Sequence, residues 1–386
     1  MKIAKVEAYW LRCPIPPERW HTSDFGTLKF FDACLVVVTT EDGRQGFGEA
    51  KGGVGSMGNC AGIVATIQQE LGPQIIGQDA RHISKIWAMM YNGSRDHYSL
   101  KRGRNFPILG RRGLTISAIS GIDMALWDLL GQSLNAPIVQ LLGGACREEM
   151  PCYASGGWAD VDGIGEQVSG YVAKGFTGVK MRVGVMDGSV NASVARVKAA
   201  REALGPDIKL MTDAHGTFSV AEAKQYCRKV EDCDLYWLEE PVNSDSPEGT
   251  AEVRRSTSIP IAVGESESTS YDIRELIHHR ACDVLQPDTA IIGGITEAQR
   301  VANLAQVHQL ELAPHLWGSA FSFMAGLHIA FANPAACILE FSLGGNPMLY
   351  DLVDGVIRPE HGHMKAPDKP GLGVTPNWDF VKEYAQ

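Results

Sequence analysis

Residues 208–215 (IKLMTDAH) form a short apolar run that ends in charged and polar side chains. Residues 234–241 (DLYWLEEP) and 259–265 (IPIAVGE) repeat this pattern, and an amphipathic stretch follows each run. A short apolar run of this kind is typical of a strand buried on both faces of a parallel sheet. The amphipathic stretch then supplies the helical crossover that two parallel strands require. The three runs therefore predict consecutive strand and helix units of one sheet.

The same pattern occurs eight times after residue 145. Eight alternating strands and helices are the number that closes a parallel sheet into a (β/α)8 barrel. We therefore predict an α/β fold built on a modified TIM barrel. The predicted strands are residues 151–155, 178–182, 208–213, 234–239, 259–265, 283–288, 310–315 and 337–341.

The two ends of the chain predict a second, smaller unit. Residues 1–50 alternate as antiparallel strands, and Asp42-Gly43 marks a hairpin, since glycine takes the positive φ of such a turn. Helical spacing begins near residue 61. We predict an α+β capping domain over residues 1–145, the barrel over 146–350, and a C-terminal segment, 351–386, that returns to the capping domain.

Composition restricts the expected partners and compartment. The 386 residues carry 35 Lys and Arg against 45 Asp and Glu, and a net charge of −10 repels nucleic acid and anionic membranes. The nine cysteines lack a CxxC pair and are expected to be reduced thiols. We find no signal-peptide pattern and no apolar run near the ~18 residues of a membrane span. We expect a cytoplasmic protein without nucleic-acid or membrane partners.

Three predicted strands end in carboxylates, Asp213, Glu239 and Glu265, at equal intervals of 26 residues. Strand ends of a barrel converge on one face, so these side chains should lie together. Three adjacent carboxylates cannot all stay ionised without a cation, and an all-oxygen ligand set favours Mg²⁺ or Mn²⁺. A single one of them would more simply cap a helix or form a salt bridge. Strand alternation is expected to turn Glu240 toward the helices.

Acid/base candidates stand on neighbouring strand ends. Asp288 and His315 lie on adjacent predicted strands. An aspartate that accepts a hydrogen bond from one imidazole nitrogen fixes the tautomer and makes the other nitrogen a general base. His215 lies two residues beyond Asp213 and should point to the same side. It is either a second proton-transfer group or a residue that orients a metal ligand.

Two cations and one further carboxylate complete the predicted site. Lys180 and Arg182 share one face of a strand, opposite the carboxylates, where they would bind an anionic substrate. Only Lys180 could exchange protons, and only with a depressed pKa, because the pKa of arginine exceeds ~12. Glu340 could donate a hydrogen bond to an oxyanion if it were kept protonated.

A possible specificity lid lies near the N-terminus. Trp20 and His21 belong to a loop, residues 14–26, that is rich in proline, serine and threonine. We predict that both side chains reach over the barrel mouth and contact the substrate. This loop and residues 51–60 would then determine the stereochemistry and chain length of the substrate.

The ordered set of motifs resembles the enolase superfamily, in particular the mandelate racemase subgroup. The resemblance implies one Mg²⁺ per active site and an enediolate formed by removal of the α-proton of a carboxylate substrate. It further implies that Asp213, Glu239 and Glu265 hold the metal, that His315 acts with Asp288, that Glu340 hydrogen-bonds the substrate carboxylate, and that Lys180 acts electrostatically. The residues that carry it are Lys180-Met181-Arg182, Asp213, Glu239-Glu240-Pro241, Gly264-Glu265, Asp288, Gly293-Gly294-Ile295-Thr296 and His315, together with 117–128 and 141–144.

One departure from the family pattern directs the functional expectation. Arg182 stands where racemases of the subgroup usually have a second lysine, the base on the other face of the carbon, and this replacement weakens racemisation. His215 resembles a histidine that takes part in proton transfer in some acid-sugar dehydratases of the group. We therefore expect a Mg²⁺-dependent dehydratase that converts an aldonate or aldarate to its 2-keto-3-deoxy product, with His315 as the preferred base.

Two alternatives remain open. One is a racemase or epimerase of a 2-hydroxy acid or an amino-acid derivative, and the other is a barrel that binds a sugar acid without turning it over. In each case the resemblance implies a homo-oligomer.

Overall fold

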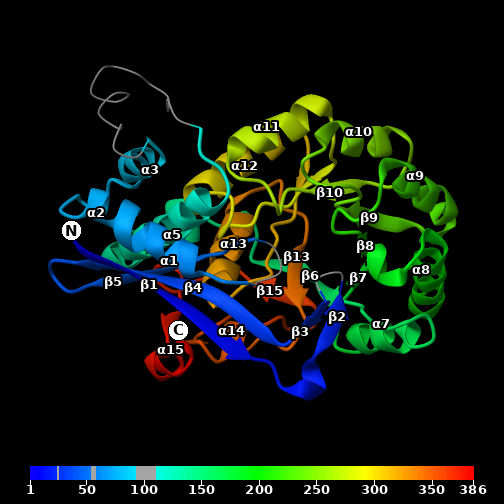
Figure 1. The fold of residues 1–386 in the computed structure, drawn as a ribbon, viewed down its shortest axis with the longest axis horizontal. Coiled ribbons are helices and arrows are strands. Elements are labelled where there is room, and N and C mark those ends of the chain that lie inside the picture. The colour runs from blue at the N-terminus through cyan, green and yellow to red at the C-terminus, as the bar shows by residue number, and fades with distance from the viewer. Residues whose placement is uncertain (24–25, 54–57, 93–109) are drawn as a thin grey trace.

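The computed structural model describes residues 1–23, 26–53, 58–92 and 110–386. Parts of the predicted loops 14–26 and 51–60 lie outside these residues. Figure 1 shows an N-terminal sheet with its helices beside a ring of strands and helices. The predicted class, a modified barrel with an α+β cap, is confirmed.

The capping sheet is antiparallel, with the order β1, β4, β5. Alternate residues of its central strand enter two different cores, because successive side chains of a strand point to opposite faces. Leu35 and Val37 pack with the barrel, whereas Val36 and Val38 pack with the capping helices. Gly43 forms the predicted hairpin turn with φ of 84°. The N-terminal strands are β1 (Ile3–Pro14), β2 (His21–Ser23), β3 (Gly26–Leu28), β4 (Phe30–Thr40) and β5 (Gln45–Ala50).

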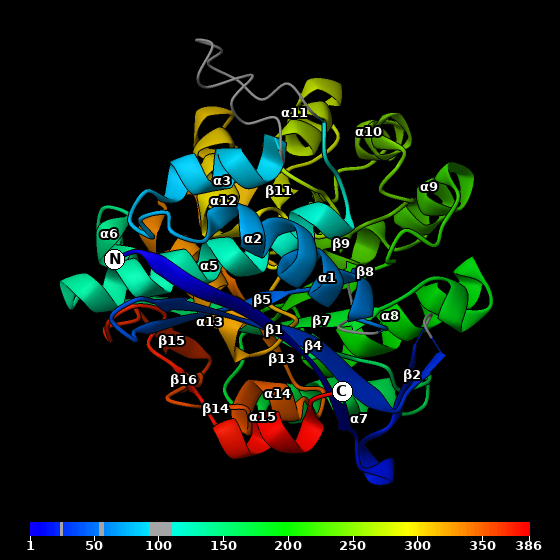
Figure 2. The same ribbon diagram turned by 60° about the vertical axis from the view of Figure 1, so that its left-hand side comes forward.

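Helices cover the outer face of this sheet, as the view in Figure 2 shows. The longest, α5, is apolar and long enough to cross a membrane, which differs from the expectation that no such run exists. However, 78% of its apolar window is buried inside the protein, where it packs on β5. The helices are α1 (Ala61–Ala65), a π-helical segment (Thr66–Leu71), α2 (Gly72–Ile75), α3 (Ile83–Asn92), α5 (Leu114–Leu134) and α6 (Ile138–Leu141).

The barrel contains the eight predicted parallel strands in chain order, with β13 beside β6. A parallel bridge between Leu312 and Ala336 connects β12 to the chain just before β13. Tyr153, Met211 and Trp237 belong to a separate apolar cluster formed by inward-facing strand residues. The strands are β6 (Glu149–Gly156), β7 (Gly178–Arg182), β8 (Lys209–Asp213), β9 (Leu235–Glu239), β10 (Ile261–Val263), β11 (Val284–Leu285), β12 (Glu311–Leu312) and β13 (Leu339–Ser342).

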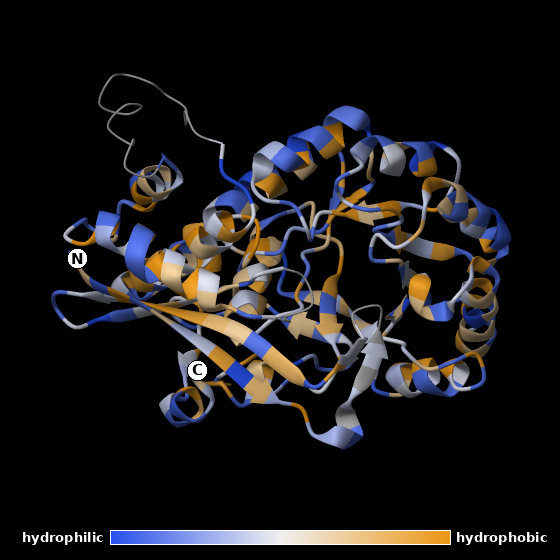
Figure 3. Ribbon diagram, viewed as in Figure 1, coloured by the Kyte–Doolittle hydropathy of each residue, from blue (hydrophilic) through white to orange (hydrophobic). Residues whose placement is uncertain are grey.

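Helices surround the strands and present hydrophilic residues outward, as Figure 3 shows along α8 to α11. Helix α13 differs, because nearly all of its residues are buried between the barrel and the cap. The helices are α7 (Ile164–Val172), α8 (Val190–Leu204), α9 (Val220–Lys229), α10 (Pro247–Arg255), α11 (Ser270–His279), α12 (Gly294–Val307) and α13 (Ala320–Ala332).

The C-terminal segment contacts both parts of the molecule. Strand β15 pairs antiparallel with β6 of the barrel. The last helix packs on the capping sheet, where the Gln386 backbone N–H donates to the Trp10 carbonyl at 2.9 Å. The elements of this segment are β14 (Val353–Asp354), β15 (His363–Lys365), β16 (Thr375–Pro376) and α15 (Trp378–Tyr384), and α14 (Pro347–Tyr350) precedes them.

Two buried aspartates on α5 attach this helix to other parts of the fold. Asp123 accepts hydrogen bonds from the backbone N–H of Thr296, at 2.9 Å, and from its hydroxyl, at 2.6 Å. Asp128 accepts from the backbone N–H groups of Phe47, at 3.0 Å, and Leu372, at 2.8 Å. Burial raises the pKa of each carboxyl to about 7. These bonds fasten α5 to α12, to the capping sheet and to the C-terminal segment.

Replacement of Asp123 by Ala tests this attachment. The variant leaves two donors of buried Thr296 without their acceptor, which should lower the free energy of unfolding by about 1–3 kcal/mol. Chemical denaturation measures the change. Asp379→Ala is the control, because that side chain is 95% exposed, and an equal loss in both variants would contradict the interpretation.

Candidate active site

The register of the barrel places charged strand ends at one level. Arg182 on β7 pairs with Asp213 on β8, and Asp213 pairs with Glu239 on β9. Lys180 lies two residues before Arg182 and therefore points to the same side. The register shifts once between Leu210 and Met211 of β8, and the direct pairing beyond this shift brings two cations and two carboxylates together.

Three predicted site residues stand on loops instead of strands. The ladders end at Val263, Leu285 and Leu312, so Glu265, Asp288 and His315 follow their strands by two or three residues. Gly264 explains the first early end, because its φ of 131° departs from strand geometry. The three side chains are nevertheless buried at the barrel mouth.

Lys180 lies within the carboxylate group. Its ammonium contacts Glu239 Oε1 closely, Glu340 Oε1 at 3.2 Å and Asp213 Oδ2 at 3.7 Å. Arg182 contacts the same Asp213 oxygen at 3.0 Å. The prediction that both cations lie opposite the carboxylates is therefore wrong, because β7 is the immediate neighbour of β8.

The carboxylates around Lys180 favour its charged form. Burial would lower this pKa, but the charges of Glu239 and Glu340 outweigh burial and raise it well above the usual value. The condition under which Lys180 could exchange protons, a depressed pKa, is not met. The side chain can stabilise negative charge electrostatically.

Glu239 is held from two further sides. Its Oε2 accepts a hydrogen bond from Gln286 Nε2 at 2.7 Å and one from the Trp237 indole at 3.0 Å. Burial nevertheless raises the pKa of Glu239. Its orientation is thus fixed by neutral donors as well as by Lys180.

Two imidazoles flank Glu265. His215 Nε2 lies 3.7 Å from Glu265 Oε1, and His315 Nε2 lies 3.7 Å from Glu265 Oε2. Burial, followed by the charges of Glu240 and Glu239, raises the pKa of Glu265 well above its usual value. The two ring nitrogens therefore approach one carboxylate from its two oxygens.

Glu240 corrects the expectation from strand alternation. The residue follows β9 with φ of 38°, a left-handed conformation in which alternation no longer applies. The side chain is buried and accepts a hydrogen bond from Ser266 Oγ at 2.9 Å. Burial and the charge of Glu267 raise the pKa of Glu240 to about 8. Ligand atoms of His215, Glu240 and Glu265 all lie within 4.8 Å of one another.

The donor set fits a hard divalent cation. Glu265 Oε2 is buried and has no hydrogen-bond partner within the described parts of the chain. Of the predicted metal ligands, Glu265 belongs to the compact cluster with His215, whereas Asp213 and Glu239 contact Lys180. The exact ligand set stays a prediction. Two cations, Lys180 and Arg182, stand among the five buried carboxylates of Asp213, Glu239, Glu240, Glu265 and Glu340.

Asp288 and His315 form the predicted pair. Asp288 Oδ2 and His315 Nδ1 are 2.7 Å apart. Burial would raise the pKa of Asp288, but the ammonium of Lys51 and the hydrogen bond from His315 outweigh it and hold this pKa at about 2. Because the ionised carboxylate only accepts, Nδ1 must carry the proton and Nε2 is free to act as a base.

Lys51 is the partner that the sequence did not predict. Its Nζ donates to Asp288 Oδ2 at 2.7 Å, although the residue belongs to the capping domain. The local sequence after β5 gives no sign of this contact, since the two residues are 237 positions apart.

Glu340 is an acceptor in this structure. Its Oε2 accepts from the backbone N–H of Leu316 at 2.9 Å. Burial would raise its pKa, but Lys180, His315 and this hydrogen bond hold it at about 2. The protonated donor expected from an acidic neighbourhood is therefore not formed here, because Lys180 lies between the carboxylates.

Trp20 contacts its own loop region. Its indole donates to the Ile15 carbonyl at 2.7 Å, and the Lys29 ammonium lies 4.9 Å from the ring centre. His21 begins β2, and its side chain lies outside the described residues. Contact of these two residues with substrate stays a prediction.

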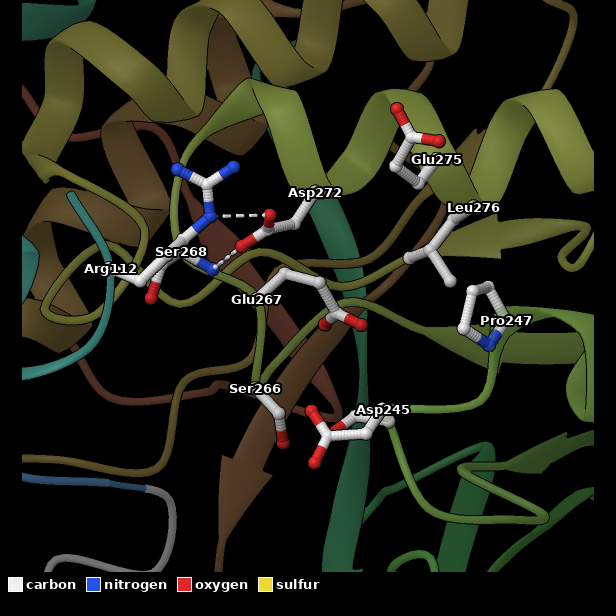
Figure 4. A pocket seen from close by; sticks show the side chains of 10 residues that line it. Arg112, Asp245, Pro247, Ser266, Glu267, Ser268, Asp272, Glu275 and Leu276 are labelled. Atoms are coloured by element: carbon white, nitrogen blue, oxygen red, sulfur yellow. Dashed lines mark hydrogen bonds and ion pairs between the residues drawn. The ribbon is translucent and has the colours of Figure 1, made fainter. Parts of the chain in front are cut away.

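An acidic pocket adjoins the site on the far side of the Glu265 loop. It has a volume of about 380 Å³, and Glu267 and Asp245 are among its lining residues. Figure 4 shows Arg112 reaching Asp272 across one wall, at 2.6 Å. Glu267 is buried like Glu265, and its Oε2 likewise has no hydrogen-bond partner among the described residues.

The family models match both parts of the chain. Residues 7–143 match the mandelate racemase and muconate lactonizing enzyme N-terminal domain, and residues 163–380 match the enolase C-terminal domain-like family. The fold, a barrel with an α+β cap, and the buried carboxylates at the barrel mouth agree with these two matches. The chain belongs to the mandelate racemase subgroup of the enolase superfamily.

Individual relatives agree with this assignment. The chain is 34% identical to D-galactarolactone cycloisomerase of Agrobacterium fabrum, over 91% of this chain and 90% of that protein. It is 31% identical to arabinonate dehydratase of Saccharolobus solfataricus, over 90% and 89% of the two chains. The chain also matches the crystal structure of a racemase from Streptomyces coelicolor with bound magnesium. The match covers 100% of both chains, with 29% identity and a TM-score of 0.86.

Thermal stability in the presence of Mg²⁺ tests the metal site. An ion that binds only the folded state raises the free energy of unfolding by about 2.7 kcal/mol at a hundredfold excess over Kd. We expect Mg²⁺ to raise the Tm of the wild type and of Asp32→Asn, but not that of Glu265→Gln. Asp32 is the control, because it is a buried carboxylate of the capping sheet that accepts from the Trp10 indole at 2.6 Å. An undiminished Mg²⁺ response of Glu265→Gln would exclude this carboxylate as a ligand.

Proposed function

We propose that the protein is a Mg²⁺-dependent sugar-acid dehydratase. It would remove the C2 proton of an aldonate or aldarate and eliminate the C3 hydroxyl, which gives a 2-keto-3-deoxy acid. The arrangement of His215 and His315 on the two oxygens of Glu265, each at 3.7 Å, carries this proposal. Elimination requires a base for one proton and an acid for the leaving group, and two imidazoles meet that requirement.

The two histidines receive different roles because their partners differ. His315 is hydrogen-bonded to the ionised Asp288, which stabilises the imidazolium that forms when Nε2 accepts the C2 proton. In the proposal His215 does not remove the C2 proton; it protonates the departing hydroxyl. His315 is assigned as the base because the carboxylate of Asp288 is bound to it.

The remaining residues would bind and stabilise the anion. Lys180 and Arg182 provide fixed positive charge where the substrate carboxylate binds and the enediolate develops. The ionised Glu340 cannot donate a hydrogen bond to a substrate carboxylate, and it instead holds Lys180, 3.2 Å away, in place. Asp213, Glu239 and Glu265 would hold Mg²⁺, with Glu240 beside them. When bound, the ion supplies additional positive charge for the enediolate. The magnesium in the racemase of Streptomyces coelicolor supports this part of the proposal.

Cycloisomerisation is the second candidate, because a relative with 34% identity is named for that reaction. The same base could remove a proton next to the carbonyl group of a sugar-acid lactone, and the same acid could protonate a departing ring oxygen. Dehydration loses one water, whereas cycloisomerisation conserves the mass of the substrate. The two candidates therefore differ in a directly measurable product.

A substrate panel decides between these candidates. Aldonates, aldarates and their lactones are incubated with the enzyme and Mg²⁺, and products are followed by semicarbazide and mass spectrometry. We expect a 2-keto acid that is lighter than its substrate by one water. Inversion at C2 in D₂O without a keto acid would instead establish a racemase or epimerase, and a keto acid of unchanged mass would establish cycloisomerisation.

Histidine variants test the division of roles. We expect His315→Asn to lose both C2 proton exchange in D₂O and dehydration, by about 10²–10⁴-fold. We expect His215→Asn to lose dehydration by a similar factor while it retains exchange. His308→Asn is the control, because this exposed histidine follows α12 at the other end of the barrel. Equal loss of exchange in both site variants would reassign His215.

A further inference from the structure

Lys51 reaches from the capping domain into the catalytic pair. It follows β5 directly, and its side chain is 1% exposed. Its ammonium contacts two groups of the barrel, Asp288 Oδ2 at 2.7 Å and the carbonyl oxygen of Trp317. A buried ammonium is retained only where acceptors replace its water, and these two acceptors do so.

The contacts of Lys51 complete a three-point attachment of the His315 loop. The His315 side chain is hydrogen-bonded to Asp288. The backbone N–H of Leu316 donates to Glu340, and the backbone carbonyl of Trp317 accepts from Lys51. Three consecutive residues are therefore held by three different elements. Two of these elements belong to the barrel, and the third belongs to the cap.

The acceptor capacity of Asp288 is also filled by this arrangement. Oδ1 accepts from the backbone N–H of Ala290 at 2.8 Å, while Oδ2 accepts from Lys51 and from His315. Without Lys51 the carboxylate would lose the ammonium that it contacts, and Oδ2 would be held by His315, the side chain that it is meant to orient. The direction of the His315 ring depends on this carboxylate.

We propose that Lys51 is a positioning residue for proton abstraction, which couples docking of the cap to the alignment of His315. The proposal rests on the assignment of His315 as a base in the proposed function. Lys51 itself does not reach the reacting atoms. It acts through Asp288 and through the backbone of the loop that carries His315.

Glu49 separates this role from ordinary attachment of the two domains. It lies on β5, close in sequence to Lys51, and accepts from the backbone N–H groups of Ser319 and Ser322 at the start of α13. It also accepts from Ser319 Oγ at 2.6 Å. Glu49 therefore binds the cap to the barrel beside the same loop but outside the catalytic pair, and Glu49→Gln is a matched control.

Steady-state kinetics with the substrate found in the panel test the proposal. Loss of a residue that orients a functional side chain indirectly, as the outer partners of metal ligands do, typically lowers activity ~10–100-fold. We expect Lys51→Met to lower kcat and C2 exchange by this factor, with KM within about twofold of the wild type. Glu49→Gln should lower the Tm and keep kcat. Lys51→Arg should retain more activity than Lys51→Gln, and added methylammonium should raise the kcat of Lys51→Ala in a saturable manner.

The outcomes distinguish the possible failures. A folded Lys51→Met with wild-type kcat overturns the proposal, and so does parallel loss of Tm and kcat in Lys51→Met and Glu49→Gln. If Lys51→Met does not fold, equal activities of Lys51→Arg and Lys51→Gln overturn it. Failure of the proposed function is separate, because the wild type would then show no C2 chemistry with any member of the panel.

Discussion

The whole site depends on one electrostatic constraint, the burial of five carboxylates at the barrel mouth with two cationic side chains among them. An ionised carboxylate loses several kcal/mol of hydration on burial unless a positive charge or hydrogen-bond donors replace water. Lys180 compensates part of this loss, and its own pKa is raised as a result. The pKa of Glu265 remains well above its usual value. The barrel mouth therefore favours binding of a further cation. Because the site is buried, its charged groups also interact strongly with a charged substrate.

The barrel meets this constraint through register. Direct pairing of Arg182 with Asp213 and of Asp213 with Glu239 holds the charged side chains in a row. Because rigid strands already position these side chains, little conformational freedom is lost when a ligand binds. The loops after β10 to β12 then bring Glu265, Asp288 and His315 to the same place. Rigid strands thus provide the electrostatic part of the site, and short loops provide the proton-transfer part.

Sequence reasoning succeeded where a periodic element determines position. The equal spacing of Asp213, Glu239 and Glu265 reflects the strand and helix unit, and the pairing of Asp288 with His315 follows from adjacent strands. It failed where position depends on a single backbone torsion or on distant segments. Glu240 turns into the site through a positive φ, and Lys51 arrives from another domain. Neither effect leaves a local pattern, because torsion at one residue and docking of a domain are decided by tertiary packing.

The proposed role of Lys51 makes the cap part of the chemistry and not only a cover. Strand β5 packs closely on α5 at Gly46 and Gly48. Near its end two side chains contact the barrel, Glu49 at the start of α13 and Lys51, just after the strand, at Asp288. One carries negative charge to a helix N-terminus, and the other carries positive charge to a carboxylate. Because the two charges are complementary to different barrel groups, they favour the orientation of the cap seen in the structure. That orientation is the one in which the His315 loop is held at all three of its attachment points.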